Sequence, residues 1–297
     1  MKNRKLITGY LLVVISAFLF GCMPLITTYI DYESISRESV VLLRNMLALP
    51  VLAVLALIQN KSLKIPVKAL PSMSLIAIMG CCVTPLLLFF SYQMISTGTA
   101  TVFHFIYPAV VVILGMLFLK KKVSLGTGLA VLLCIVGIGL FYDPAQELDL
   151  LGCILALVSG ITYAIYIVLL SAFKYKEVSG FKLSFYISLI CTVVMLVVCL
   201  ITDKLDFPTN LTEWGLCILL ALVISVGAVV MFQKGAYLIG GERASILSTV
   251  EPITGMLVGI FILQDQEPYV GSMIGSVLVV AASVLIAVFD ARKKEST

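Results

Sequence analysis

Ten apolar runs constrain this chain more than any other feature of its sequence. A spanning helix needs about 20 predominantly apolar residues. Of the 297 residues, 61% are hydrophobic and 12% are charged, whereas soluble domains carry about 25% charged residues. The mean hydropathy is +1.14. The runs cover approximately residues 6–30, 38–58, 71–95, 100–119, 124–142, 149–173, 180–202, 213–239, 244–263 and 268–289. The sequence therefore predicts an all-α membrane protein with ten transmembrane helices and no appended soluble domain.

The placement of Lys and Arg predicts the orientation of these helices, because cytoplasmic connections carry an excess of both residues. Basic and acidic connections alternate along the chain, and only Arg37 and Lys204 are basic on the acidic side. We therefore expect a multi-pass protein of the cell membrane with both termini in the cytoplasm. The net charge of +4 reflects this topology and indicates no nucleic-acid partner. The first run exceeds the roughly 7–15 apolar residues of a signal peptide, so we interpret it as the first span.

Segments in the two halves of the chain resemble each other at a nearly constant offset. Gly9, Ser16 and Phe20 match Gly152, Ser159 and Tyr163 at an offset of 143 residues. Ala100, Pro108, Gly115 and Leu119 match Ala244, Pro252, Gly259 and Leu263 at an offset of 144. Because each half holds five helices, an odd number, the two copies have opposite orientations in the membrane. We therefore predict two inverted five-helix repeats, residues 1–147 and 148–297, an arrangement found in many secondary transporters.

These repeated motifs resemble those of the drug/metabolite transporter superfamily, in its ten-helix EamA-type branch. The resemblance covers essentially the whole chain. It rests on "PAVVVILGMLFL" and "PITGMLVGIFIL", on the glycine-rich runs after residues 124 and 268, and on Arg44. Family members commonly carry an acid after helices 4 and 9; Asp265 and Glu267 approximate the second, whereas Lys120 to Lys122 replace the first. The resemblance implies a central cavity lined by helices 1, 3, 4, 6, 8 and 9.

Glu251 is the most unusual residue in the apolar runs, because an ionisable group at the bilayer centre costs about 2.5–3.5 kcal/mol on insertion scales. Lys234 lies about as far before the turn near Gly240 as Glu251 lies after it, so both should reach a similar depth. They form either a structural ion pair or a substrate or proton site. The matching residues in the first half, Phe90 and Tyr107, are uncharged, which favours a functional role.

Four further candidate residues lie in the two matching runs, residues 100–119 and 244–263. Pro108 and Pro252 remove backbone hydrogen bonds, and such breaks in membranes occur only against protein or a wet cavity. His104 precedes Pro108 by one helical turn and shares a face with Tyr107. His104 is either a satisfied buried residue or a proton-sensitive group, since its ordinary pKa is about 6.5.

The remaining candidates are less specific. We expect Arg44 to extend to the extracellular interface, with a binding role as the alternative. Gln93, Tyr163 and Tyr166 are candidates for the cavity wall, although aromatic residues in helices mostly serve packing. Gly271 and Gly275 have a spacing that permits close helix contact, either within the chain or in a homodimer.

The sequence indicates neither a metal site nor a cofactor. All eight cysteines lie within apolar runs without metal-ligand spacing, and the chain has one histidine. A phosphate-binding GxxxxGK[ST] motif is absent. We therefore predict a gradient-driven transporter of a small polar organic solute such as an amino acid, an amine, another metabolite or a drug. Proton coupling is one option. The alternatives are an intramembrane enzyme acting on lipid or peptide, for which HExxH and GxSxG are absent, and a membrane scaffold.

Overall fold

Helices form throughout the apolar runs, as expected where lipid offers the backbone no hydrogen-bond partners. The computed structural model describes residues 2–30, 32–95, 97–120, 124–140, 149–173, 175, 178–263 and 270–295, and contains no strand within these ranges. The first five predicted runs correspond to α1 (Lys2–Gly21), α2 (Met23–Thr27), α3 (Arg37–Met46), α4 (Leu49–Asn60), α5 (Leu70–Ala77), the π-helical segment η2 (Ile78–Val83), α6 (Thr84–Ser91), α7 (Thr97–His104), α8 (Tyr107–Leu119) and α9 (Leu125–Gly139), and the 3₁₀ turn η1 (Val67–Ala69) precedes the third run.

The second half of the chain has the same character. Its five predicted runs contain α10 (Leu150–Ala172), α11 (Gly180–Ile201), α12 (Leu211–Leu220), the π-helical segment η3 (Ala221–Ala228), α13 (Val229–Ile239), α14 (Gly241–Leu247), α15 (Val250–Val258), the π-helical segment η4 (Gly259–Leu263) and α16 (Val270–Glu295). Consecutive helices within one run are interrupted pieces of one predicted span. The predicted Asp265 and Glu267, with Lys121 and Lys122, lie outside the described residues.

Most of the predicted runs are long enough to cross a bilayer. Within the described part of the chain, seven segments are both long and apolar enough: Lys5–Thr27, Arg37–Gln59, Val67–Ser91, Leu150–Ala172, Gly180–Ile201, Leu211–Ile239 and Gly241–Leu263. Three shorter apolar helices, Tyr107–Leu119, Leu125–Gly139 and Met273–Ala282, fall in the other three runs. The protein is thus an all-helical, multi-pass membrane protein, while the count of ten spans stays a prediction.

The helices begin and end at residues suited to these positions. The side chains of Ser36, Ser124, Asp149, Ser179 and Asn210 each accept a hydrogen bond from the backbone N–H three residues later. Such N-caps satisfy donors that a helix leaves unpaired. Gly240 joins α13 to α14 at a φ of 89°, a conformation that favours glycine.

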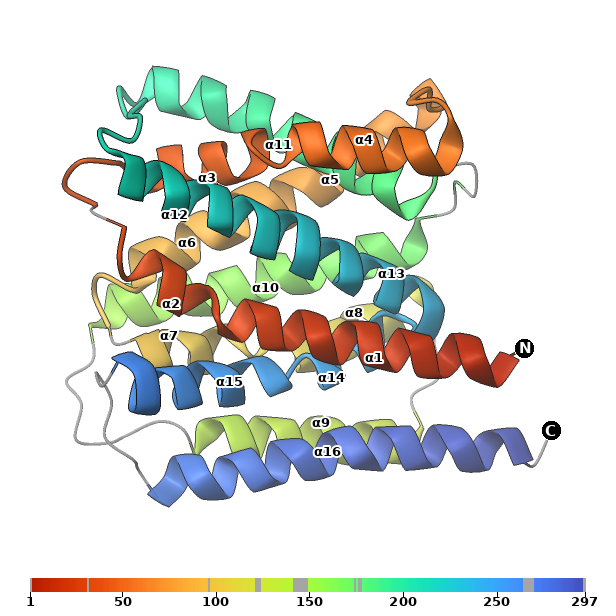
Figure 1. Ribbon diagram of the computed structural model, residues 1–297. Helices are drawn as coiled ribbons and strands as arrows, with labels where there is room; N and C mark the ends of the chain where they lie inside the picture. The colour runs from red at the N-terminus through yellow and green to blue at the C-terminus, as the bar shows by residue number, and fades with distance from the viewer. Residues whose placement is uncertain are drawn as a thin grey trace.

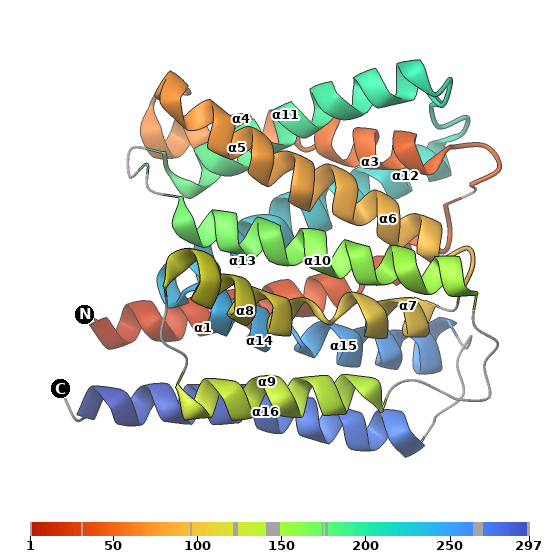
Figure 2. The ribbon, with the colours of Figure 1, turned by 180° about the vertical axis from the view of Figure 1, so that it is seen from behind.

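The contacts that the first helix of one half makes with the other half recur for the first helix of the second half. In the first half α1 contacts α13 and α15; in the second half α10 contacts α6 and α8, which occupy the corresponding runs. The last helix of each half, α9 and α16, pack on each other along one edge of the bundle (Figure 1). From behind, α10 lies between α6 and α8 (Figure 2). The boundary of the predicted repeats at residues 147 and 148 stays a prediction.

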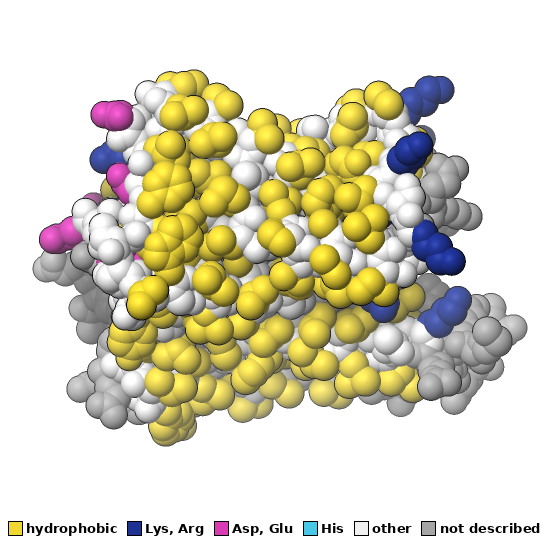
Figure 3. Space-filling model, turned by 45° about the horizontal axis from the view of Figure 1, so that its top comes forward, with side chains coloured by type: hydrophobic (Ala, Val, Ile, Leu, Met, Phe, Trp, Pro, Cys, Tyr) yellow, Lys and Arg dark blue, Asp and Glu magenta, His cyan; other side chains and the backbone are white. Residues whose placement is uncertain are grey.

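Charge and apolar surface are separated along the helix axes. Both termini lie at the same end of the bundle (Figure 1). Figure 3 shows most of the visible Lys and Arg side chains at that end, the Asp and Glu side chains with one basic side chain at the opposite end, and a broad apolar surface between them. We call these the basic end and the acidic end. Their separation is the pattern that the alternation of basic and acidic connections predicts.

Candidate functional site

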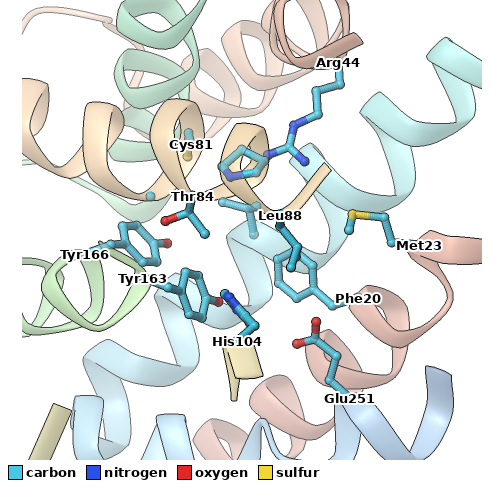
Figure 4. A pocket seen from close by; sticks show the side chains of 13 residues that line it. Phe20, Met23, Arg44, Cys81, Thr84, Leu88, His104, Tyr163, Tyr166 and Glu251 are labelled. Carbon is cyan, nitrogen blue, oxygen red and sulfur yellow. The ribbon is translucent and has the colours of Figure 1, made fainter. Parts of the chain in front are cut away.

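A small cavity lies in the middle of the bundle, where helices from both halves meet. Its volume is about 60 Å³, room for roughly five water molecules at 10–15 Å³ each. Every one of the six implied helices contributes to its wall, and helix 2 adds Arg44. The lining residues are Phe20, Met23, Arg44, Gly80, Cys81, Thr84, Pro85, Leu88, His104, Tyr163, Tyr166, Val229 and Glu251 (Figure 4).

Glu251 enters this cavity from the second residue of α15. The chain between α14 and α15 is interrupted at Ser248 and Thr249, and the Glu251 N–H donates to the Ser248 carbonyl at 2.9 Å. The Glu251 side chain is half-buried and directed into the cavity (Figure 4). Gly21 of α1 lies against this point, since a Cβ atom there would be 2.7 Å from the Glu251 carbonyl oxygen. The absence of a side chain at Gly21 therefore lets α1 close one wall of the cavity.

Arg44 lies in the same cavity, and the expectation that it extends to the extracellular interface is wrong. Its side chain is only 5% exposed and its Nε atom has no hydrogen-bond partner. α3 packs against α6 and α11. These contacts fix the rotation of α3 about its axis, and in that rotation Arg44 points inward. The guanidinium of Arg44 and the carboxylate of Glu251 face the cavity from opposite sides, yet no ion pair joins these two described residues (Figure 4).

Lys234 does not accompany Glu251. Lys234 is exposed and lines a different cavity, of about 320 Å³, together with Gln59, Tyr175 and Tyr237. The number of residues between a side chain and the turn predicts how far along the helix axis the side chain lies, but not the direction in which it points. Gly235 packs on α1, where a Cβ atom would be 3.1 Å from the Gly9 carbonyl oxygen, and neighbouring residues of a helix point about 100° apart. The predicted ion pair is therefore absent from the structure.

His104 lines the cavity, and its ring is hydrogen-bonded to Ser159, a residue that does not line the cavity. Its Nδ1 atom lies 2.8 Å from the Ser159 hydroxyl, and that hydroxyl donates to the Ala156 carbonyl at 2.6 Å. Tyr163 also lines the cavity, with its ring centroid 5.4 Å from that of His104. Tyr107 is fully buried and packs edge-on against Tyr163 at 4.9 Å. Tyr107 thus supports the wall without lining the cavity.

The helix that carries Pro108 is interrupted at Phe105 and Ile106, between α7 and α8. Pro108 has no N–H to donate to the carbonyl of His104, four residues earlier. Gly160 of α10 lies so close to this carbonyl that a Cβ atom there would clash with it. Pro252 follows Glu251 just after the matching interruption in the second half. Both prolines are buried, and the residues beside the two breaks, His104 and Glu251, line the cavity.

Gln93 lies in a separate cavity nearer the acidic end, of about 190 Å³. With its amide oxygen turned toward Arg37, Gln93 accepts hydrogen bonds from the guanidinium. The same guanidinium lies 4.5 Å from the centroid of the Tyr32 ring, a cation–π contact. Burial raises the pKa of Tyr32 to about 12, against the opposing effect of Arg37. We call this space the outer cavity; Pro24 and Phe89 line it, and their neighbours Met23 and Leu88 line the central one.

Two features of the wall were not predicted from the sequence. Thr84 bonds the Met79 carbonyl and the Thr162 hydroxyl, each at 2.7 Å; a polar residue directly before Pro85 in an apolar run was an available signal. The π-helical segments η2 and η3 occupy matching runs of the two halves, and Gly80 of η2 lines the cavity. Such segments are frequent at functional sites, but no pattern of residues in the sequence predicted them.

Comparison with known proteins assigns the chain to a family. A model of the EamA-like transporter family matches residues 7–142 and 150–288. The chain belongs to the EamA-like transporter family. This membership confirms the resemblance to the drug/metabolite transporter superfamily and makes the chain a transporter in general terms.

Individual relatives agree with this assignment. The chain is 29% identical over 195 residues to an uncharacterized transporter of Archaeoglobus fulgidus, covering 66% of this chain and 68% of that one. It is 24% identical over 206 residues to the biotin transporter of Escherichia coli strain K12, covering 68% of each chain. A protein crystal structure matches the fold with a TM-score of 0.74 at 14% identity, covering 96% of this chain and 98% of that one.

Proposed function

We propose that this EamA-like protein is a secondary transporter that carries a small polar organic solute across the cell membrane through the central cavity. The observation that supports this most is the pair of charged side chains, Arg44 and Glu251, in a cavity between the two halves. Ionisable groups inside a membrane bundle mark solute and ion pathways. We further propose that both termini are cytoplasmic, so that the basic end faces the cytoplasm.

The three cavities follow one another along the bundle in a way that suits alternating access. The outer cavity adjoins the central one through neighbouring residues of α2 and α6. Toward the basic end, Tyr166 separates the central cavity from the one lined by Gln233, and the Gln233 amide donates to the Tyr166 hydroxyl at 3.4 Å. Gln233 in turn accepts from the Ser184 hydroxyl at 2.7 Å. All three residues belong to the second half, so opening the site to the basic end requires α10 and α13 to move apart within that half, in addition to the rocking of one half against the other.

The intramembrane enzyme is the alternative, and the contact between His104 and Ser159 is its best candidate site. A nucleophilic serine must give its proton to the histidine. Ser159 instead donates to the Ala156 carbonyl, is fully buried and does not line the cavity. The geometry therefore supports transport over hydrolysis.

The experiment is solute uptake into sealed vesicles that contain only the purified protein. Radiolabelled amino acids, amines and biotin are offered under an imposed pH gradient, with protein-free vesicles as the control. We expect saturable uptake of at least one solute, recovered chemically unchanged. Uptake of none, or recovery of a chemically altered product, contradicts the proposal.

A further inference from the structure

The central cavity contains one positive and one negative side chain, and neither is neutralised by the protein. Arg44 reaches it from α3 and Glu251 from α15, with Phe20 and Leu88 between them (Figure 4). No hydrogen bond to the Glu251 carboxylate and no ion pair to either charge is formed within the described residues. The two charges therefore balance each other across the cavity without touching.

A charge without a partner is costly inside a membrane bundle; this applies most to the buried Arg44 and to a lesser degree to the half-buried Glu251. A guanidinium has five N–H donors, and the Nε donor of Arg44, in a side chain that is 5% exposed, has no acceptor. Two uncharged hydroxyls, those of Tyr107 and Ser225, also have no partner among the described residues, whereas Thr84 is paired with Thr162 and Ser184 with Gln233. Buried charges in proteins are ordinarily paired or hydrogen-bonded. The missing acceptor at Arg44 and the missing donor at Glu251 thus define what a ligand must supply.

We propose that the solute of this transporter is a zwitterion whose anionic group binds Arg44 and whose cationic group binds Glu251. This proposal rests on the transport function proposed above and adds the chemical class of the solute. Arginine binds a carboxylate through two parallel hydrogen bonds, and a carboxylate such as Glu251 accepts from an ammonium group. A solute with a single charge would leave the opposite side chain uncompensated in the closed cavity, which is unfavourable.

The rest of the wall limits the part of the solute between its charged groups. Phe20, Leu88 and Tyr163 are apolar or aromatic, and the cavity volume is about 60 Å³. A short hydrocarbon spacer fits this wall, and aromatic faces also attract an ammonium group. The solute is therefore a small zwitterion with a compact apolar middle.

A series of ω-amino acids measures the separation of charges that the cavity accepts. Glycine, β-alanine, 4-aminobutyrate, 5-aminopentanoate and 6-aminohexanoate carry the same two end groups at increasing distances, and L-serine and L-leucine add side chains. Binding to the purified full-length protein in detergent is measured by calorimetry and by thermal stabilisation. Pentanoate and pentylamine, each with one charge, are the matched controls. We expect at least one zwitterion to bind, and each single-charge control to bind at least about tenfold more weakly.

Two variants test which side chain binds the anionic group of the solute and which binds the cationic group. In Arg44→Gln the zwitterion should lose its advantage over the amine, and in Glu251→Gln it should lose its advantage over the acid. Binding of no zwitterion in the series, or tightest binding of a singly charged compound, overturns the proposal even if the variants fail to fold. Equal weakening of acid and amine by both variants also overturns it. Binding is read without transport: a zwitterion that binds but is not carried refutes only the transport proposal, whereas uptake of a singly charged solute alone refutes only this one.

Discussion

The Nδ1 atom of His104 lies 2.8 Å from the Ser159 hydroxyl, whose only proton is donated to the Ala156 carbonyl. The hydroxyl therefore accepts from Nδ1, so Nδ1 carries a proton and the neutral ring keeps its lone pair on Nε2. This bond fixes the ring that forms part of the cavity wall.

The first prediction follows from this bond. Ser159→Ala leaves the Nδ1–H donor buried without an acceptor, which should cost about 1–3 kcal/mol and lower the melting temperature in detergent. Ser171→Ala is the matched control, because the half-buried Ser171 bonds only the Ile167 carbonyl of its own helix. Equal melting temperatures for Ser159→Ala and the parent would show that His104 does not depend on Ser159.

A second prediction concerns Glu251 and Lys234, which line different cavities. Residues without a shared contact show additive effects within about 0.3–0.5 kcal/mol. The double variant Glu251→Gln with Lys234→Met should therefore have the sum of the two single effects on stability, and it should not regain transport lost in Glu251→Gln. Recovery of either property in the double variant would show that the two charges are paired.

Third, Gly160 should not accept a side chain. A Cβ atom at this position meets the His104 carbonyl beside the helix break, and overpacking of this kind costs about 1–3 kcal/mol. Gly160→Ala should lower the melting temperature, whereas Gly128→Ala, where a Cβ atom meets nothing within 4 Å, should not. A stable Gly160→Ala variant would contradict the close approach of α10 to this break.

The orientation of the bundle gives a fourth prediction. In a background without the eight native cysteines, Lys204→Cys at the acidic end should react with an impermeant thiol reagent in intact cells. Lys64→Cys at the basic end should react only after permeabilisation. Both lysine side chains are exposed, so accessibility differs only by side of the membrane. Labelling of position 64 in intact cells, with position 204 protected, would reverse the orientation.

The sequence predicted those features that depend on counting residues along the chain. The apolar runs located the helices, and the offset between the segments around Pro108 and Pro252 led to the family. Glu251 and His104 were candidates because they lie close to the two prolines, and Tyr163 was a less specific candidate from the sixth run; all three line the cavity.

Features that depend on the rotation of a helix were not predictable. Arg44 was expected at the interface and Lys234 beside Glu251, and both expectations failed for the same reason. Depth follows from the number of residues after a turn, whereas direction follows from contacts such as that of Gly235 with α1. The π-helical segments add a residue to a turn and so change the rotation of the helix beyond them.

The glycine spacing in the last helix left open whether the close contact lies within the chain or in a homodimer. Gly275 approaches Gly137 of α9 within the chain, where a Cβ atom at Gly137 would be 2.9 Å from the Gly275 carbonyl oxygen. The homodimer stays a prediction.

Proton coupling is a separate proposal for Glu251, since a carboxylate in the cavity can carry a proton as well as a ligand. It leads to uptake that depends on an imposed pH gradient in the wild-type protein and ceases to depend on it in any Glu251→Gln protein that retains uptake.

We propose above that the cavity containing Arg44 and Glu251 is the transport site. The most direct test of this proposal is uptake of the tightest-binding solute into vesicles containing the wild-type protein, Arg44→Gln, Glu251→Gln or Lys234→Met, each shown to be folded and inserted in equal amount. We expect saturable wild-type uptake, uptake near background for both cavity variants, and retained uptake for Lys234→Met. Undiminished uptake by both Arg44→Gln and Glu251→Gln would contradict it.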